Sequence, residues 1–171
     1  GFNIRGGSAD QNLILLNEST VFNPFHFFGF FSSFNAESIQ DVELHKSVMP
    51  PRYGGRLSSV LKITSIKGDK QKVKGTAGLG LITSRINVEG PIIKDKTSFN
   101  VGARTTYSDW IFDLLPTSSG YKNTQASFYD FNVTLDHQVN ASNSLTFYTY
   151  FSKDKSNLNT DTSYNYTNPN F

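Results

Sequence analysis

The sequence contains no cysteine, and only 18% of its 171 residues are charged. Without cysteine the chain cannot form disulfides, a cysteine-ligated zinc site or a thiol nucleophile. The formal net charge is only +2, and basic residues gather only in the short stretch 67–74, so the charge pattern of a nucleic-acid binder is missing. An initiator methionine is lacking as well, because the chain begins at Gly1, and we expect this start to be internal to a longer protein.

Long apolar runs are also absent. The richest stretch, residues 25–34, is interrupted by His26, Gly29 and two serines, so the sequence predicts no helix of the roughly 18 residues that span a membrane. Strands of about 9 to 11 residues with one apolar face could cross a membrane instead, and such strands are compatible with the mean hydropathy of -0.37.

Catalytic and metal-binding patterns are missing too. His26, His45 and His137 lie far apart in the sequence and lack the spacing of a zinc site. No serine stands in the Gly-x-Ser-x-Gly frame of a nucleophile elbow. The sequence therefore predicts no enzyme, and it predicts no bound cofactor or metal.

The chain divides into two zones, which we interpret as domains at residues 1–68 and 69–171. The first zone is mixed, with β-like runs on either side of Asn17-Glu18 and a short helix capped by Asn35. A strand near Val42 and a buried strand between Leu57 and Ile66 complete it. The second zone consists of β-strands separated by turns.

Strict alternation of apolar and polar residues in the second zone is the strongest physical signal in the sequence. Each strand has one apolar face, which we expect to face lipid, and one polar face, which we expect to face the lumen of a barrel. The predicted lipid-facing residues are Phe99, Val101, Tyr129, Phe131, Val133, Leu135, Leu145 and Phe147. The predicted lumen-facing residues are Asn100, Arg104, Asp130, Asn132, Thr134 and Tyr148.

We expect five strands, at residues 73–81, 85–92, 97–112, 127–139 and 144–153. The apolar positions change parity near Ile82, which favours a hairpin there. Short turns at 94–96 and 141–143 alternate with long polar segments at 116–125 and after Lys153, a rhythm typical of outer-membrane barrels.

A soluble antiparallel sandwich would show similar alternation, but its exposed faces usually carry many lysines and glutamates. Here the polar faces carry few charges. Aromatic residues also stand near the expected strand ends, at Tyr107, Trp110, Phe112, Phe128 and Tyr129. Both features favour the barrel.

An ordered set of motifs runs through the first zone. They are FNIRGG at residues 2–7, NLILL at 12–16, NPFHFFGFFS at 23–32, IQDVEL at 39–44 and PRYGGRLSSVL at 51–61. Together they closely resemble the plug of TonB-dependent outer-membrane receptors in its Bacteroidetes-like version. The resemblance continues through residues 89–92 and 104–107 into the first barrel strands, although Asn17-Glu18 stands where the family tends to have Asp-Gly.

The resemblance implies a mainly β fragment: the later part of a plug with α and β elements, then about five antiparallel strands of an incomplete 22-stranded barrel. The location it implies is the outer membrane of a Gram-negative bacterium. The whole receptor would bind a scarce nutrient, such as an iron chelate, a glycan or a peptide. It would import that nutrient when the TonB complex pulls on an N-terminal region absent from this chain. The implied partners are thus the TonB complex, the nutrient and outer-membrane lipid.

The resemblance also assigns roles to glycines and arginines of the plug motifs. The glycines that would allow turns with positive φ are Gly6, Gly7, Gly54 and Gly55. The arginines hypothesised to lock the plug to the barrel wall are Arg5, Arg52 and Arg56. For each arginine the other interpretation is a solvated or locally paired surface residue. The alternative function for the chain is a soluble β-rich binding or adhesion domain that recognises carbohydrate through exposed aromatic residues.

Overall fold

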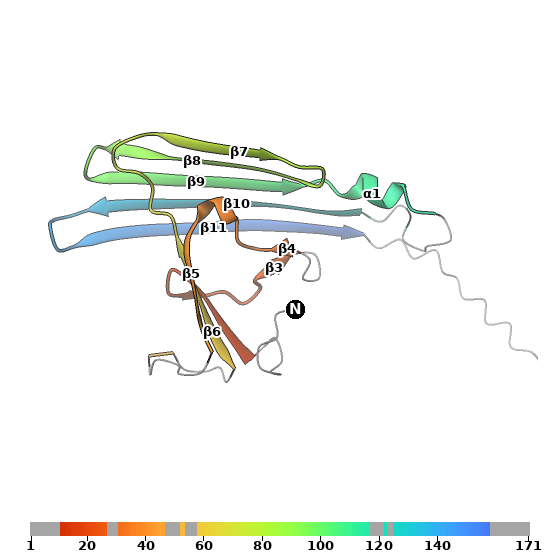
Figure 1. The fold of residues 1–171 in the computed structure, drawn as a ribbon, viewed down its shortest axis with the longest axis horizontal. Coiled ribbons are helices and arrows are strands. Elements are labelled where there is room, and N and C mark those ends of the chain that lie inside the picture. Colours follow the sequence, from red (N-terminus) through yellow and green to blue (C-terminus); the bar gives the residue numbers. More distant parts are fainter. Residues whose placement is uncertain are drawn as a thin grey trace, which may run out of the picture.

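A computed structural model gives the structure of residues 11–26, 31–46, 52–53, 58–116, 122 and 125–157. The chain is mainly β, as the sequence predicts, and its strands form two principal sheets and one short pair (Figure 1). Among the helices of the described ranges, none is long and apolar enough to cross a membrane.

The first part of the chain, up to residue 65, forms what we call the small unit. Its four-stranded sheet has the order β2-β1-β6-β5, in which β1 and β6 are parallel and the other pairs are antiparallel. These strands are β1 (Asn12–Leu16), β2 (Ser19–Thr20), β5 (Ile39–His45) and β6 (Ser59–Ser65). The pair β3 (Phe25–His26) and β4 (Phe31–Ser32) and the 3-10 helix η3 (Ala36–Ser38) lie between β2 and β5 in the chain.

Two predicted local features of the small unit are confirmed. Asn17 and Glu18 connect β1 to β2 with φ of 48° and 67°, the positive values that a two-residue hairpin turn of type I′ requires. The side chain of Asn17 also accepts a hydrogen bond from the backbone N–H of Ser65 at 3.0 Å, which stabilises the turn without glycine. Asn35 caps the short helix, because its Oδ1 accepts from the backbone N–H of Glu37 at 3.3 Å.

The second part of the chain forms an antiparallel meander, here called the large sheet, in the order β11-β10-β9-β8-β7. Its strands are β7 (Lys74–Leu79), β8 (Thr83–Ile93), β9 (Thr97–Thr106), β10 (Gln125–Gln138) and β11 (Ser144–Asn157). The predicted hairpin near Ile82 and the short turns at 94–96 and 141–143 therefore stand where the sequence placed them.

Two expectations about the large sheet are wrong. β9 ends at Thr106 rather than continuing to residue 112, and Asp109–Asp113 forms the helix α1. The alternation of apolar and polar residues ends here, because three apolar residues follow Asp109 in succession. The carboxylate of Asp109 also accepts a hydrogen bond from the backbone N–H of Ala126 at 2.9 Å. Phe128 shares the parity of the polar residues of β10 and is only 3% exposed, so it is not one of the surface aromatics.

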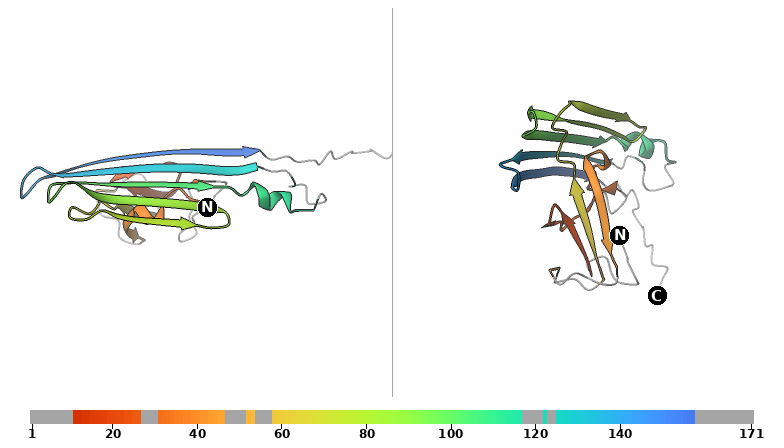
Figure 2. Two further views of the ribbon diagram at one scale, coloured as in Figure 1. Left: turned by 90° about the horizontal axis from the view of Figure 1, so that it is seen from above. Right: turned by 60° about the vertical axis from the view of Figure 1, so that its left-hand side comes forward.

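The small unit lies against one face of the large sheet, and β5 and β6 run steeply across the direction of β10 and β11 (Figures 1 and 2). Ile14, Leu16 and Ile63 form the core of the small sheet. Tyr148 of β11 packs against this core from the large sheet. The two sheets are therefore joined by side-chain packing as well as by the chain that connects β6 to β7.

Candidate functional site

The large sheet buries its polar face and exposes its apolar face. In β10, Asp130, Asn132 and Thr134 are at most 3% exposed, whereas Tyr129 and Phe131 on the other side are 47% and 42% exposed. A sheet in a water-soluble protein is expected to bury its apolar side chains instead. We call the buried polar side the inner face and the exposed apolar side the outer face.

The predicted faces correspond to the two sides of the sheet. The eight residues expected to face lipid all lie on the outer face, where Leu145 and Phe147 are 67% and 58% exposed and Phe99, Val101 and Val133 are half-buried. The six residues expected to face the lumen all lie on the inner face. The small unit and the segment that follows it contact that inner face through three groups of polar contacts.

The first group surrounds His26, which is 2% exposed in the small unit. Its Nδ1 lies 2.6 Å from Oδ1 of Asp154, and its Nε2 lies 3.1 Å from the hydroxyl of Tyr150. Nε2 also lies 3.6 Å from Oδ2 of Asp130. The imidazole stacks on Phe128, with 4.2 Å between ring centroids. One histidine of the small unit thus contacts both β10 and β11.

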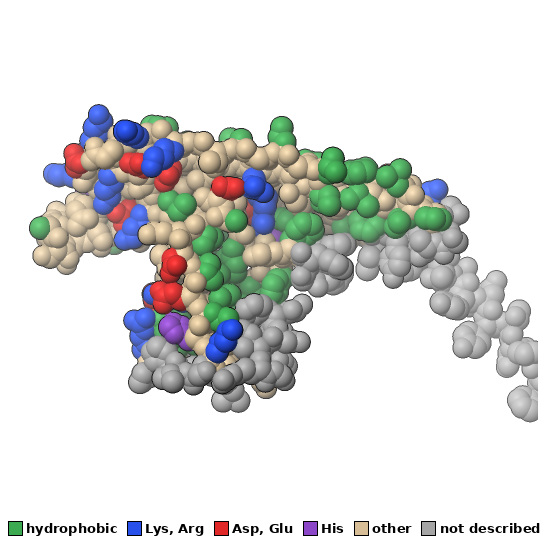
Figure 3. Space-filling view, in the orientation of Figure 1, with side chains coloured by type: hydrophobic (Ala, Val, Ile, Leu, Met, Phe, Trp, Pro, Cys, Tyr) green, Lys and Arg blue, Asp and Glu red, His purple; other side chains and the backbone are tan. Residues whose placement is uncertain are grey.

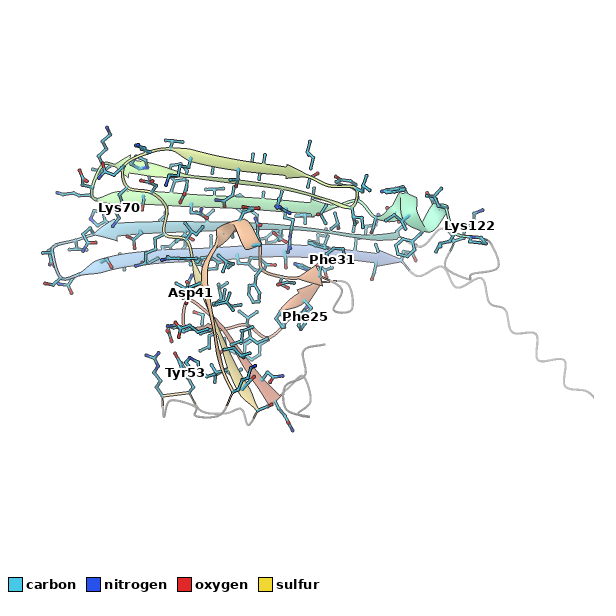
Figure 4. The ribbon with its side chains drawn as sticks, viewed as in Figure 1. Phe25, Phe31, Asp41, Tyr53, Lys70 and Lys122 are labelled. Atoms are coloured by element: carbon cyan, nitrogen blue, oxygen red, sulfur yellow. The ribbon has the colours of Figure 1, made fainter. Side chains whose placement is uncertain are left out.

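Arg104 of β9 belongs to the same group. Its Nε and one terminal nitrogen donate to Oδ2 of Asp130 at 2.8 and 2.6 Å, and the terminal nitrogen also donates to the backbone carbonyl of Ser32 at 2.6 Å. Asp130 is almost fully buried, so this guanidinium neutralises a charge that water cannot reach. Figure 4 shows Phe31, the neighbour of Ser32, lying against the large sheet here, with its ring centroid 5.3 Å from that of Phe128.

The second group lies at the middle of the sheet, around Ser38 of η3. The hydroxyl of Ser38 lies 2.9 Å from Oδ1 of Asn87 and 3.1 Å from Oδ1 of Asn132, and it can donate to one of them at a time. Gly102 lies beneath this contact. A Cβ at Gly102 would overlap the Ser38 hydroxyl and would lie 2.5 Å from Oδ1 of Asn132, so only glycine leaves room for the helix to dock.

The third group lies toward the short-turn end of the sheet, where the chain leaves the small unit. Asp136 of β10, 2% exposed, lies 3.3 Å from the Nζ of Lys67 and 2.8 Å from the Nζ of Lys70. Gly68, with φ of 90°, lies so close to β9 that a Cβ there would overlap the carbonyl of Phe99. Figure 4 marks Lys70 at this end, and Figure 3 shows charged side chains gathered over it.

Two further groups of charged side chains lie at the start of the large sheet and within the small unit, and neighbouring charges shift their pKa values. The Nζ of Lys74 and the backbone N–H groups of Gln71 and Lys72 donate to Asp69, which lowers the pKa of its carboxyl to about 2. In the small unit, Glu43 raises the pKa of Lys62, and Glu18 adds to the effect.

Of the predicted arginine and glycine positions, only Arg52 falls among the described residues. The hypotheses for Arg5, Arg56, Gly6, Gly7, Gly54 and Gly55 lie outside the described residues. Arg52 is exposed, with its guanidinium carbon 4.6 Å from the ring centroid of Tyr53. Figure 4 places Tyr53 at the end of the small unit away from the large sheet, so within the described chain Arg52 contacts its neighbour and not β7–β11.

Sequence reasoning identified the inner-face residues of the sheet but missed their partners. His26, Ser38 and Lys70 carry no periodic signal, and the pair His26 and Asp154 is separated by 128 positions. The alternation along each strand predicts which residues of the large sheet face inward, but it does not predict which residues of the small unit contact them. Within the described ranges, no three histidine, aspartate or glutamate side chains are grouped so that they could hold a metal ion.

No protein-family model and no curated protein matches the sequence. Among solved structures, the fold is similar to the crystal structure of the siderophore receptor PirA from Acinetobacter baumannii, with a TM-score of 0.64 and 21% sequence identity. The similarity covers 90% of this chain and 25% of that receptor. The fold of this chain is therefore similar to that of about one quarter of that receptor.

Proposed function

We propose that the chain is part of a TonB-dependent receptor in the outer membrane of a Gram-negative bacterium. Residues 1–68 would be the later part of its plug, and residues 69–171 the first strands of its barrel. One observation carries the proposal: the sheet exposes its apolar face and buries its polar face under a second unit. Lipid is the solvent in which this arrangement is favourable.

The connections of the sheet set its orientation in this proposal. The turns at 94–96 and 141–143 are short, as on the periplasmic side of such barrels, whereas α1 lies in the long connection between β9 and β10. The long connections would then face the outside, where a nutrient arrives. An iron chelate is the first candidate ligand because the similar structure is a siderophore receptor. Glycans and peptides are the other candidates, and no catalytic role is proposed.

The contacts between the small unit and the inner face suit a plug that must move. They are mostly hydrogen bonds and ion pairs, made by His26, Ser38 and Arg104. When such groups separate they exchange protein partners for water, and the net cost is only about 0.5 to 1.5 kcal/mol for a typical hydrogen bond. An apolar interface would oppose separation over its whole area. A pull through the TonB complex could therefore displace the unit without unfolding the wall.

The arginine lock hypothesised from the plug motifs remains part of the proposal. Arg52 would meet a wall segment other than β7–β11, since it contacts Tyr53 in the described chain, and Arg5 and Arg56 keep the role hypothesised for them from the motifs. Arg104 makes a contact of the same kind with the arginine on the barrel wall: its guanidinium extends from β9 to the backbone carbonyl of Ser32 in the small unit.

The experiment compares growth of three strains: wild type, a strain without the full-length gene, and a strain without TonB. Each strain is supplied with ferric siderophores as the only iron source, and then with glycans or peptides as the only carbon source. Growth on one ligand should require both genes, and the protein should be recovered in the outer-membrane fraction. A protein recovered in the soluble fraction that binds carbohydrate would favour the adhesion alternative and contradict the proposal.

A further inference from the structure

The outer face of the large sheet is not uniformly flat but carries a groove of about 510 Å³. Its floor is formed by Ala103 and Thr105 of β9. The register places Ala103 between Ile86 of β8 and Phe131 of β10, and it places Thr105 beside Tyr129. Small side chains on the central strand between large ones on its neighbours leave a trough, and its lining is almost entirely apolar.

Two lysines of β11 lie on the same face, to the side of the end of this groove that Thr105 and Tyr129 form. Lys153 of β11 pairs with Tyr129, and Lys155 pairs with Ser127, so both share the outer face with Phe131 and Phe151. Both lysines are exposed. Asp154 between them points to the inner face, where its carboxylate lies 2.6 Å from His26. The outer face of β11 therefore changes from aromatic to basic within one pair of residues.

Aromatic residues mark the same level of the sheet. Tyr107 and Trp110 are 39% and 44% exposed, and each also bonds to the β7–β8 hairpin. The hydroxyl of Tyr107 donates to the carbonyl of Gly80, and the indole N–H of Trp110 donates to the carbonyl of Leu81 at 3.1 Å. Rings with one polar and one apolar end are enriched at the boundary between the acyl chains and the headgroups of a bilayer. The groove thus reaches the expected headgroup level, with Lys153 beside its upper end and Lys155 two residues further along β11.

We infer that this surface binds one anionic lipid, with an acyl chain in the groove and a headgroup phosphate at Lys153 and Lys155. The inference rests on the proposed function, because it needs the outer face to meet a bilayer. Lys153 lies two strands from the groove floor, about 10 Å at the usual strand spacing, which a lysine side chain and a headgroup span together. Charge complementarity favours an anionic lipid over a second copy of this chain, because a second copy of the same face would place its lysines against Lys153 and Lys155.

The test uses the full-length receptor that carries this chain, with Val101→Cys as its only reactive cysteine, labelled with bimane and reconstituted into lipid vesicles. Val101 lies below Thr105 on the outer face of β9, so the label detects lipid chains without filling the groove. Dibrominated phosphatidic acid should quench the label at least roughly fivefold more effectively than dibrominated phosphatidylcholine, since each of the two lysines near an anionic headgroup contributes about 1 kcal/mol, or about fivefold.

Three variants distinguish lipid binding at Lys153 and Lys155 from a general attraction of anionic lipid to any lysine of the sheet. Lys153→Gln with Lys155→Gln should bring the preference for phosphatidic acid close to onefold. The matched control, Lys94→Gln with Lys96→Gln, removes two lysines from the turn at the opposite end of the sheet and should keep the preference. Ala103→Leu fills the groove floor and should weaken quenching by both lipids.

The inference is overturned if the first pair of substitutions leaves the preference unchanged, or if both lysine pairs reduce it equally. It is also overturned if neither lipid quenches the label and cross-linking detects a second copy across this face. A receptor that fails to insert into vesicles contradicts the proposed function itself. A receptor that inserts but shows equal quenching by the two lipids contradicts this inference alone.

Discussion

Single residues on the inner face determine whether the small unit can dock, and Gly102 is the most sensitive of them. Gly102→Ala would force a methyl group into the hydroxyl of Ser38 and the side-chain amide of Asn132. Such overpacking typically costs about 1 to 3 kcal/mol. We expect the substitution to lower the unfolding temperature of the full-length protein in detergent and to speed proteolysis of the small unit. Gly75→Ala is the matched control, because the nearest atom to a Cβ there is 3.7 Å away. Equal effects of the two substitutions would contradict the docking role of Gly102.

The pair of Arg104 and Asp130 gives the second prediction at this scale. Removing the guanidinium leaves a carboxylate whose side chain is fully buried, and breaking a buried pair in this way costs about 3 to 5 kcal/mol. Arg104→Met should therefore destabilise the protein strongly in urea titrations. The double variant Arg104→Met with Asp130→Asn should be more stable than Arg104→Met alone, because no unpaired charge remains. A double variant as unstable as the single one would show that the pair matters through packing rather than charge.

At the scale of elements, β10 carries the clearest consequence of alternation. Val133 lies near its middle on the outer face, whereas Val139 follows its end and is 60% exposed. If the outer face meets lipid, Val133→Arg should cost about 2 to 4 kcal/mol and Val139→Arg about 0 to 1 kcal/mol, because the cost depends on depth in the bilayer. The measurement is equilibrium folding of the full-length protein into lipid vesicles against urea. Equal costs at the two positions would argue against a membrane-spanning strand.

The elements also indicate how far the sequence could predict this molecule. The strands of the large sheet were predictable because alternation is local and each strand repeats it many times. The helix α1 was missed because the apolar run after Asp109 resembles a strand end, although Ser108 and Asp109 are residues that favour a helix start. The contacts of His26 and Ser38 were not predictable, since each depends on how two separately folded elements are placed. A sequence pattern defines the face of a strand but not the partner that covers it.

At the scale of the whole molecule, the two faces of the large sheet differ in whether the chain itself covers them. The small unit covers much of the inner face, where buried polar atoms of Asn100, Asp130 and Asn132 have no hydrogen-bond partner among the described residues. The outer face exposes Phe131, Leu145, Phe147 and Phe151. Among the described strands, β7 and β11 are the edges of the sheet, and each pairs on one side alone. Unpaired edges and a broad apolar face both promote association with other chains. Within the described residues, the inner face is thus largely covered by the small unit, whereas the outer face and the two edge strands are exposed.

This asymmetry predicts the behaviour of the isolated 171-residue chain. In water it should associate into large particles, and detergent above its critical micelle concentration should reduce them, because detergent covers the outer face. Light scattering after size-exclusion chromatography measures both states. Replacing Phe131, Leu145 and Phe147 with threonine should lower association in water, because threonine keeps strand propensity while removing most of the apolar area. The control replacement of the exposed inner-face residue Ser152 by threonine should leave association unchanged. A monodisperse monomer that melts cooperatively without detergent would contradict the membrane interpretation of the sheet, since its apolar face would then be compatible with water.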